Sequence, residues 1–154
     1  MKKRYTADRS VLQNAAKTLL ANIRFASVDD PIRSIAVTSS VPNEGKTTVS
    51  TSLGEAIASS GKRCLMVECD MRKRLLAHAL GVRSTSGVYA VLTDQVPLAE
   101  AVVETHVPNL YFLDAEPSIP NPADIISSKR FGRLVGTFEE SYDYVVLDSP
   151  PVGT

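Results

Sequence analysis

The sequence has no tryptophan, two cysteines and no surplus of either charge, since 17 Lys and Arg balance 17 Asp and Glu among 154 residues. Binding to nucleic-acid phosphates requires an excess of positive charge, so the balance argues against a nucleic-acid partner. Cys64 and Cys69 lie five residues apart in an expected strand, so their side chains point to opposite faces of the sheet. We expect both thiols to be free and buried.

The sequence also lacks a long hydrophobic run, because no apolar segment approaches the roughly 18 residues that a membrane-spanning helix needs. Residues 1–4 are basic, but polar residues return before any apolar block of a signal peptide, so we expect a cytoplasmic chain. We expect residues 1–9 to form a basic flexible leader ahead of one domain over residues 10–154. Such a leader can rest on an anionic membrane, although a solvated tail is the simpler interpretation.

Segments that favour strands alternate with helical patterns, which is typical of a parallel sheet covered by helices. Runs of apolar and β-branched residues predict buried strands at residues 35–39, 64–70, 110–113 and 144–148. Helical spacing of apolar residues predicts one helix that begins at Ser10 and another that follows Thr48 and ends at Gly61. Further helices are expected at residues 75–80, 88–92, 97–103 and 122–139.

Gly45-Lys46-Thr47 ends a phosphate-binding loop pattern, G-x-x-x-x-G-K-[ST], in which Ser40 replaces the first glycine. The segment lies between an expected strand and an expected helix, whose N-terminus offers N–H groups and partial positive charge to a phosphate. An ordinary strand-to-helix turn with an exposed lysine is the alternative. The pattern predicts that the phosphates of ATP or ADP are bound by Ser40, Val41, Pro42, Asn43, Glu44, Gly45, Lys46, Thr47 and Thr48.

Two other expected strands end in acidic residues, at Glu68-Cys69-Asp70 and at Asp148. The carboxyl ends of parallel strands share one edge of a sheet, which would bring these carboxylates beside the phosphate loop. Mg²⁺ prefers oxygen ligands, so we expect Thr47, Asp70 and Asp148 to hold it. A helix cap is the alternative for any single strand-ending aspartate.

Three segments together resemble the nucleotide motifs of the bacterial tyrosine kinases, P-loop enzymes of capsule and exopolysaccharide assembly. They are residues 39–48 (SSVPNEGKTT), 65–72 (LMVECDMR) and 142–151 (YDYVVLDSPP), and residues 120–131 (PNPADIISSKRF) are similar to a further family segment. The resemblance runs from about residue 10 to the end. It implies an α/β fold with a three-layer, P-loop NTPase-like parallel sheet flanked by helices.

The resemblance implies an autophosphorylating, ATP-dependent protein-tyrosine kinase that regulates capsular or extracellular polysaccharide synthesis and export, with ATP and Mg²⁺ as cofactors. Lys46 would then polarise the ATP phosphates, and Arg72 matches an arginine of the family motif. Glu68 stands where the family usually has an aspartate that is proposed to activate the acceptor tyrosine hydroxyl. Expected partners are protein tyrosine substrates and a membrane-anchored activator or polysaccharide co-polymerase, which would place the chain at the inner face of the membrane.

The sequence departs from the family pattern in its first helix and in its length. Family members usually assemble into rings through a Glu-x-x-Arg-x-x-Arg pattern, and the aligned positions are Asn14, Lys17 and Leu20, so no ring is expected. Family kinases also continue beyond the third motif, so we expect the fold to be incomplete at its C-terminus.

Two other functions fit parts of the sequence. A ParA/MinD-type ATPase switch would carry an additional lysine early in the loop, where this chain has Val41. A non-catalytic partner protein that binds a nucleotide is the second alternative, favoured by the two replaced charges of the first helix.

Overall fold

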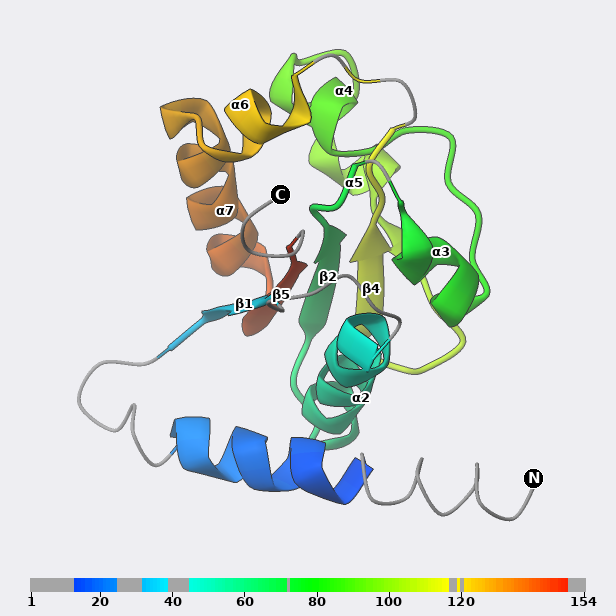
Figure 1. Cartoon of the computed structure of the whole chain (residues 1–154), viewed down its shortest axis with the longest axis vertical. Coiled ribbons are helices and arrows are strands. Elements are labelled where there is room, and N and C mark those ends of the chain that lie inside the picture. The colour runs from blue at the N-terminus through cyan, green and yellow to red at the C-terminus, as the bar shows by residue number, and fades with distance from the viewer. Residues whose placement is uncertain are drawn as a thin grey trace.

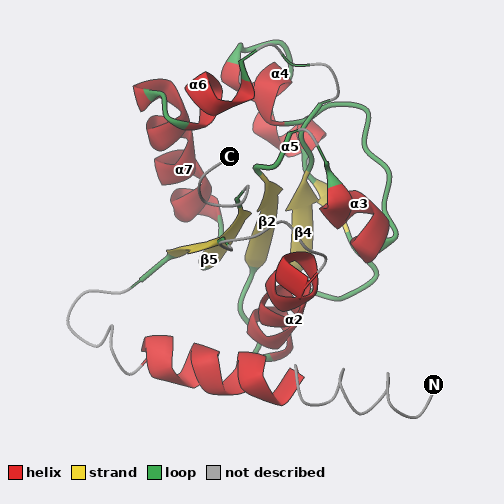
Figure 2. Ribbon diagram, viewed as in Figure 1, coloured by secondary structure: helices red, strands yellow, loops and turns green. Residues whose placement is uncertain are grey.

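One sheet organises the part of the chain that the structure, a computed structural model, describes: residues 13–24, 32–38, 45–71, 73–116, 119 and 121–149 (Figures 1 and 2). Its five strands follow the order β1-β5-β2-β4-β3. They are β1 (Ser34–Val37), β2 (Cys64–Glu68), β3 (Val103–Glu104), β4 (Leu110–Leu113) and β5 (Tyr144–Asp148). Four strands run parallel, and β3 pairs antiparallel with β4 at one edge.

Helices cover both faces of the sheet, which confirms the predicted three-layer α/β fold (Figure 1). One face packs against a helix over residues 13–24 and against α2 (Gly45–Ser59) and α3 (Leu75–Leu80). The other face packs against α4 (Val88–Leu92), α5 (Leu98–Ala101), α6 (Pro122–Ile126) and α7 (Lys129–Ser141). No helix of the described residues is long and apolar enough to cross a membrane.

The central strand β2 shows why the two cores form. All five of its residues are buried, with Cys64 and Met66 on the α2 face and Leu65 and Val67 on the α7 face. Successive side chains of a strand point to opposite faces, so one apolar run supplies both cores. The two cysteines are free and buried, as the sequence predicts, and burial raises the pKa of both thiols.

Glycines end two helices, and the sequence predicts the first of them, Gly61. Gly61 follows α2 with a φ of 88°, and Gly81 caps α3 with a φ of 67°, both in the left-handed region that glycine adopts without steric cost. The helix expected to begin at Ser10 is described only from residue 13 onwards, and the proposed leader over residues 1–9 lies outside the described residues.

Three predicted helices are wrong in their extent, and the first of them, α2, begins at Gly45 rather than after Thr48. The segment 97–103 forms a short α5 that ends at Ala101, because Val103 pairs with Phe112 of β4 as an edge strand. The segment 122–139 forms two helices, α6 and α7. Ser128 lies between them in an extended conformation, and its hydroxyl accepts a hydrogen bond from Phe131 N, which starts α7 anew.

Candidate functional site

The carboxyl ends of three parallel strands meet at one edge of the sheet. In the pairing register, Val37 at the end of β1 lies opposite Asp148 of β5, and Asp148 lies opposite Glu68 of β2. Helix α2 begins at Gly45, beyond the carboxyl end of β1. The structure therefore has the expected arrangement. The Gly45-Lys46-Thr47 segment begins a helix that follows a strand, and it lies beside two strands that end in acidic residues.

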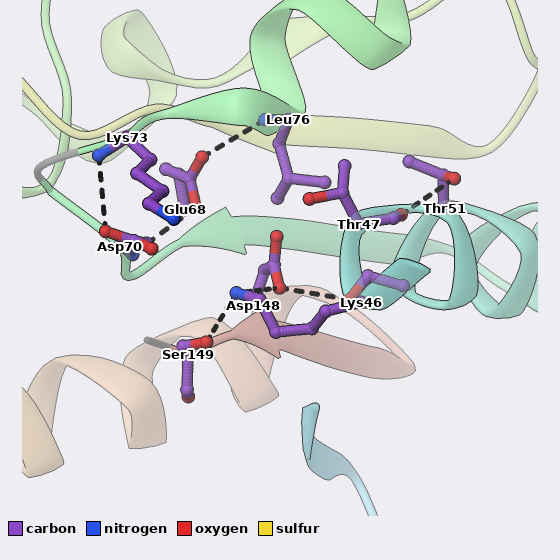
Figure 3. Close-up of polar contacts among 10 residues, drawn as sticks. Lys46, Thr47, Thr51, Glu68, Asp70, Lys73, Leu76, Asp148 and Ser149 are labelled. Atoms are coloured by element: carbon purple, nitrogen blue, oxygen red, sulfur yellow. Dashed lines mark hydrogen bonds and ion pairs between the residues drawn. The ribbon is translucent and has the colours of Figure 1, made fainter. Parts of the chain in front are cut away.

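Lys46 forms a buried ion pair with Asp148 at the centre of this edge (Figure 3). Its Nζ lies 2.7 Å from Asp148 Oδ1, and the two side chains are 6% and 1% exposed. Lys46 Nζ also donates a hydrogen bond to the backbone oxygen of Ser149, and Ser50 Oγ donates to Asp148 Oδ1 over 3.2 Å. The first and second turns of α2 thus present a cation and a hydroxyl to one carboxylate.

The pKa of Asp148 reflects this burial. Loss of water around the carboxylate raises its pKa, and the hydrogen bonds and charge from Lys46 together with the Ser50 hydroxyl oppose that increase. The negative charge of Asp70 raises the pKa further. A second cation at this carboxylate would lower the pKa again, because opposite charge favours the ionised form.

Thr47 is buried in the first turn of α2, and its backbone oxygen accepts a hydrogen bond from Thr51 Oγ1 over 3.0 Å. Gly45 and Thr48 in the same turn are exposed. The N-terminus of a helix carries partial positive charge, which here lies beside the Lys46 ammonium, and phosphates commonly bind at such a position. The turn therefore combines the groups that a phosphate requires.

Asp70 lies two residues beyond the end of β2 and is 8% exposed. Its Oδ1 accepts a hydrogen bond from Lys73 N over 3.2 Å, and its backbone oxygen accepts one from Arg74 N over 3.0 Å. The carboxylate therefore belongs to a hydrogen-bonded turn between β2 and α3 rather than to a free loop.

Glu68 is fully buried at the last position of β2. Its Oε1 accepts a hydrogen bond from Leu76 N over 3.1 Å, and its Oε2 accepts one from Asp70 N over 3.3 Å (Figure 3). Burial raises the pKa of Glu68 to about 8, and the charges of Asp148 and Asp70 add to the increase, whereas the two N–H donors oppose it.

The structure brings four of the predicted site residues to one edge, namely Lys46, Glu68, Asp70 and Asp148, with Thr47 next to Lys46 in the same turn. Gly45 and Thr48 lie in that turn as well, and the other predicted positions lie outside the described residues: Ser40, Val41, Pro42, Asn43, Glu44 and Arg72. Their roles stay predictions.

Three polar residues at this edge, Ser50, Arg74 and Asp114, were not predicted from the sequence. Ser50 binds Asp148, and Arg74 forms an ion pair with Asp114, with Nη2 and Oδ2 2.9 Å apart. Asp114 is 2% exposed and follows β4 directly. The rule that identified Asp70 and Asp148, an acid at the end of a buried strand, also applies to Asp114 and could have found it. Ser50 has no such signal, because a serine in a helix is common.

The donor set at Asp148 fits Mg²⁺. The Asp148 carboxylate supplies hard oxygen atoms, of which Oδ1 contacts Lys46 Nζ and the Ser50 hydroxyl. Among the described residues, no group of three or more His, Cys, Asp and Glu is placed to hold a metal ion. Mg²⁺ at nucleotide sites is typically bound by one or two carboxylates together with phosphate oxygens and water.

A family model described as "AAA domain" matches residues 32–153. The chain belongs to the AAA-domain family. The matched range begins just before β1 and includes every described strand and helix except the helix over residues 13–24.

Known proteins similar to this chain include bacterial tyrosine-protein kinases, which confirms the resemblance seen in the sequence. Tyrosine-protein kinase YwqD of Bacillus subtilis (strain 168) is 34% identical over 147 residues, which are 96% of this chain and 62% of YwqD. The solved BceF tyrosine kinase domain has a TM-score of 0.80 and 34% identity, and the match covers 92% of this chain and 57% of that one. This AAA-domain chain thus spans less than two thirds of either.

A septum site-determining protein shares the fold with a lower TM-score. The septum site-determining protein MinD of Pyrococcus horikoshii OT3, solved in complex with Mg-ADP, has a TM-score of 0.67 and 25% identity to this chain. The match covers 80% of this chain and 51% of MinD. By TM-score, the kinase domain is therefore the nearer of the two structures.

Proposed function

We propose that this chain is the nucleotide-binding part of an ATP-dependent protein-tyrosine kinase that regulates capsular or extracellular polysaccharide synthesis and export. The observation that carries the proposal is the buried Lys46–Asp148 ion pair at the carboxyl edge of the sheet, next to the first turn of α2. A phosphate-binding lysine and a metal-binding aspartate are the two charges that nucleotide chemistry requires. The similarity to YwqD and to the BceF kinase domain supports phosphoryl transfer to tyrosine.

In this proposal Lys46 exchanges partners when a nucleotide binds. The phosphate oxygens give its ammonium group a second anionic partner, which frees the Asp148 carboxylate to bind a metal. Thr47, Asp70 and Asp148 would hold Mg²⁺, which when bound neutralises phosphate charge during transfer. The N–H groups at the start of α2 would orient the phosphates together with residues 40–44, and Arg72 would be one of the catalytic residues.

Calorimetry of ADP binding in the presence of Mg²⁺ tests the nucleotide site. We expect Lys46→Met to weaken binding at least tenfold, because it removes a charge-assisted contact worth about 1.5–3 kcal/mol. Lys62→Met, at an exposed position, is the matched control and should bind like the parent. Unchanged affinity of the Lys46 variant would contradict the assignment of the phosphate site.

Incubation with labelled ATP, Mg²⁺ and a poly-Glu-Tyr polymer tests the reaction. Label on tyrosine supports the kinase. Free phosphate alone supports the alternative of an ATPase switch, which the fold likeness to MinD favours. Absence of both products, with nucleotide binding intact, supports a non-catalytic partner protein. A membrane-anchored activator, which we propose as the partner, should increase tyrosine labelling when added.

A further inference from the structure

The carboxyl group of Glu68 contacts the backbone of the following segment through both of its oxygens. Oε1 accepts from Leu76 N and Oε2 accepts from Asp70 N, and the side chain has no exposed surface. Leu76 is the second residue of α3, whose N-cap residue Arg74 makes no side-chain capping bond. The N–H groups of a first helical turn need an outside acceptor, so Glu68 of β2 acts as the side-chain cap of α3.

The same contacts hold Asp70. Its N–H binds Glu68, its backbone oxygen binds Arg74 N, and its Oδ1 binds Lys73 N, so it is fixed at three atoms. The far end of this turn is fixed as well, because Arg74 forms its ion pair with the buried Asp114 beyond β4. Glu68 therefore fixes one end of the turn that carries Asp70, and Asp114 fixes the other end through Arg74.

We propose that Glu68 is a positioning residue, which caps α3 and holds the Asp70 carboxylate for the metal, rather than the group that takes the proton from an acceptor hydroxyl. The inference rests on the proposed function, in which Asp70 binds Mg²⁺. The resemblance to the kinases implies the other role for this position. The length of the side chain matters here, because an aspartate is shorter by one C–C bond, about 1.5 Å, and cannot reach Leu76 N from the same backbone.

Two substitutions at Glu68 separate the roles, since one preserves length and the other preserves charge. Glu68→Gln keeps the reach and one acceptor oxygen for Leu76 N but loses the acceptor for Asp70 N, whereas Glu68→Asp keeps the charge and loses the reach to Leu76 N. A positioning role predicts that the Asp variant is the more damaged of the two. A proton-accepting role predicts the reverse, because glutamine has no basic oxygen and aspartate has.

The first readout is the Mg²⁺ concentration at half-maximal ADP binding, measured by calorimetry without turnover. We expect it to rise about fivefold in Glu68→Asp, which is the fold-change for one lost hydrogen bond, and to rise less in Glu68→Gln. Glu140→Gln, at an exposed position on α7, is the matched control and should not differ from the parent. If Glu68→Asp binds Mg²⁺–ADP like the parent, the inference is overturned.

The second readout is hydrogen exchange at the Leu76 amide, which reports the capping contact whether or not a nucleotide binds. Exchange should accelerate in Glu68→Asp and stay near the parental rate in Glu68→Gln. A parent chain that binds no Mg²⁺–ADP would overturn the proposed function and the metal part of this inference, while unchanged exchange in Glu68→Asp would overturn the capping part. In an active chain, tyrosine labelling that Glu68→Gln abolishes and Glu68→Asp retains would assign Glu68 as the base.

Discussion

At the scale of single residues, the buried Lys46–Asp148 pair bears on stability as well as on the proposed function. Two charges that are 6% and 1% exposed have lost most of their water, and each compensates the other. The benefit of such a pair over an apolar pair is small, but removal of one partner leaves an unpaired buried charge. We therefore expect a single substitution at either position to affect folding and, in the proposed function, nucleotide binding as well.

We expect Lys46→Met to lower the free energy of unfolding by about 3–5 kcal/mol, the usual effect of breaking a buried pair from one side. The double variant Lys46→Met/Asp148→Asn removes both charges and should recover a large part of that loss. Urea unfolding of the parent, the two single variants and the double variant measures the coupling. Additive losses would contradict the buried pair, and the double variant also serves as a folded protein without the phosphate-binding lysine.

Glu68 makes stability depend on pH. Its pKa is raised by burial from 4.5 to about 8, so the folded chain holds the proton more tightly than the unfolded chain. The resulting stabilisation is complete below about pH 4.5 and is lost as the pH rises to about 8. Asp148, whose pKa is also raised, contributes with the same sign.

We therefore expect the free energy of unfolding to fall between pH 5 and pH 8, and the fall to be smaller in Glu68→Gln, which has no proton to lose. Urea unfolding at several pH values measures both slopes. Glu140→Gln, at an exposed position, should follow the parent. A parental stability that rises over this range, or an equal slope in Glu68→Gln, would show that burial does not govern this carboxyl group.

At the scale of elements, the junction of β4 and α4 depends on a glycine. Gly87 precedes α4 and forms a parallel bridge with Asp114, and Val88 N donates to Asp114 O over 2.8 Å. A Cβ at Gly87 would lie 2.1 Å from that same oxygen. Glu116 adds a second connection, because its Oε1 accepts from Gly87 N and Ala90 N. The backbone of α4 can thus approach β4 only through glycine.

We expect Gly87→Ala to destabilise the chain by about 1–3 kcal/mol, since the contact is with backbone and cannot be relieved by a side-chain rotation. Gly136→Ala is the matched control in the middle of α7, where a Cβ meets nothing within 4 Å. The control should stabilise by about 0.5–1 kcal/mol, because alanine favours a helix over glycine. Thermal unfolding of both variants measures the opposite shifts, and equal shifts would exclude the close approach at Gly87.

The elements also show what a sequence can predict in this chain and what it cannot. Apolar runs fixed the four parallel strands, and the acids that end two of them led to Asp70 and Asp148. Edge strand β3 was not predicted, because it has only two residues, too few for a strand pattern, and is defined by its antiparallel pairing with the nearby β4. The capping role of Glu68 was not predicted either, because it also depends on a contact that forms only in the folded chain. The spacing of residues does not reveal that a turn at Asp70 brings Leu76 N back to the end of β2.

At the scale of the whole molecule, the helix over residues 13–24 is packed by its apolar residues. Ala16 and Leu20 are 6% and 5% exposed and belong to the core cluster with Leu53 and Ile57 of α2 (Figure 1). Arg24 Nη2 also donates to Ser60 Oγ, just beyond α2, over 2.7 Å. Leu19 is also apolar, but it is 43% exposed. The buried stripe is therefore narrower than the sequence suggests, but it includes Leu20.

This packing bears on assembly. The resemblance to the kinases implies a ring that forms when charges of the first helix bind a neighbouring subunit. Of the three aligned positions, Asn14 is exposed but neutral, Lys17 is exposed and charged, and Leu20 is buried in the core. An arginine at position 20 would bury a charge among apolar side chains, so one substitution cannot restore the pattern without loss of stability.

We expect no salt-sensitive ring, because one exposed charge does not supply the ion pairs that would hold it. The Debye length falls from about 10 Å at 0.1 M salt to about 3 Å at 1 M, so an assembly held by exposed ion pairs dissociates over that range. Light scattering should give the same apparent mass at both salt concentrations, for the parent and for Lys17→Glu alike. A large species that dissociates with salt in the parent, and that is absent in Lys17→Glu, would show that Lys17 alone recruits a neighbour and that burial of Leu20 does not prevent assembly.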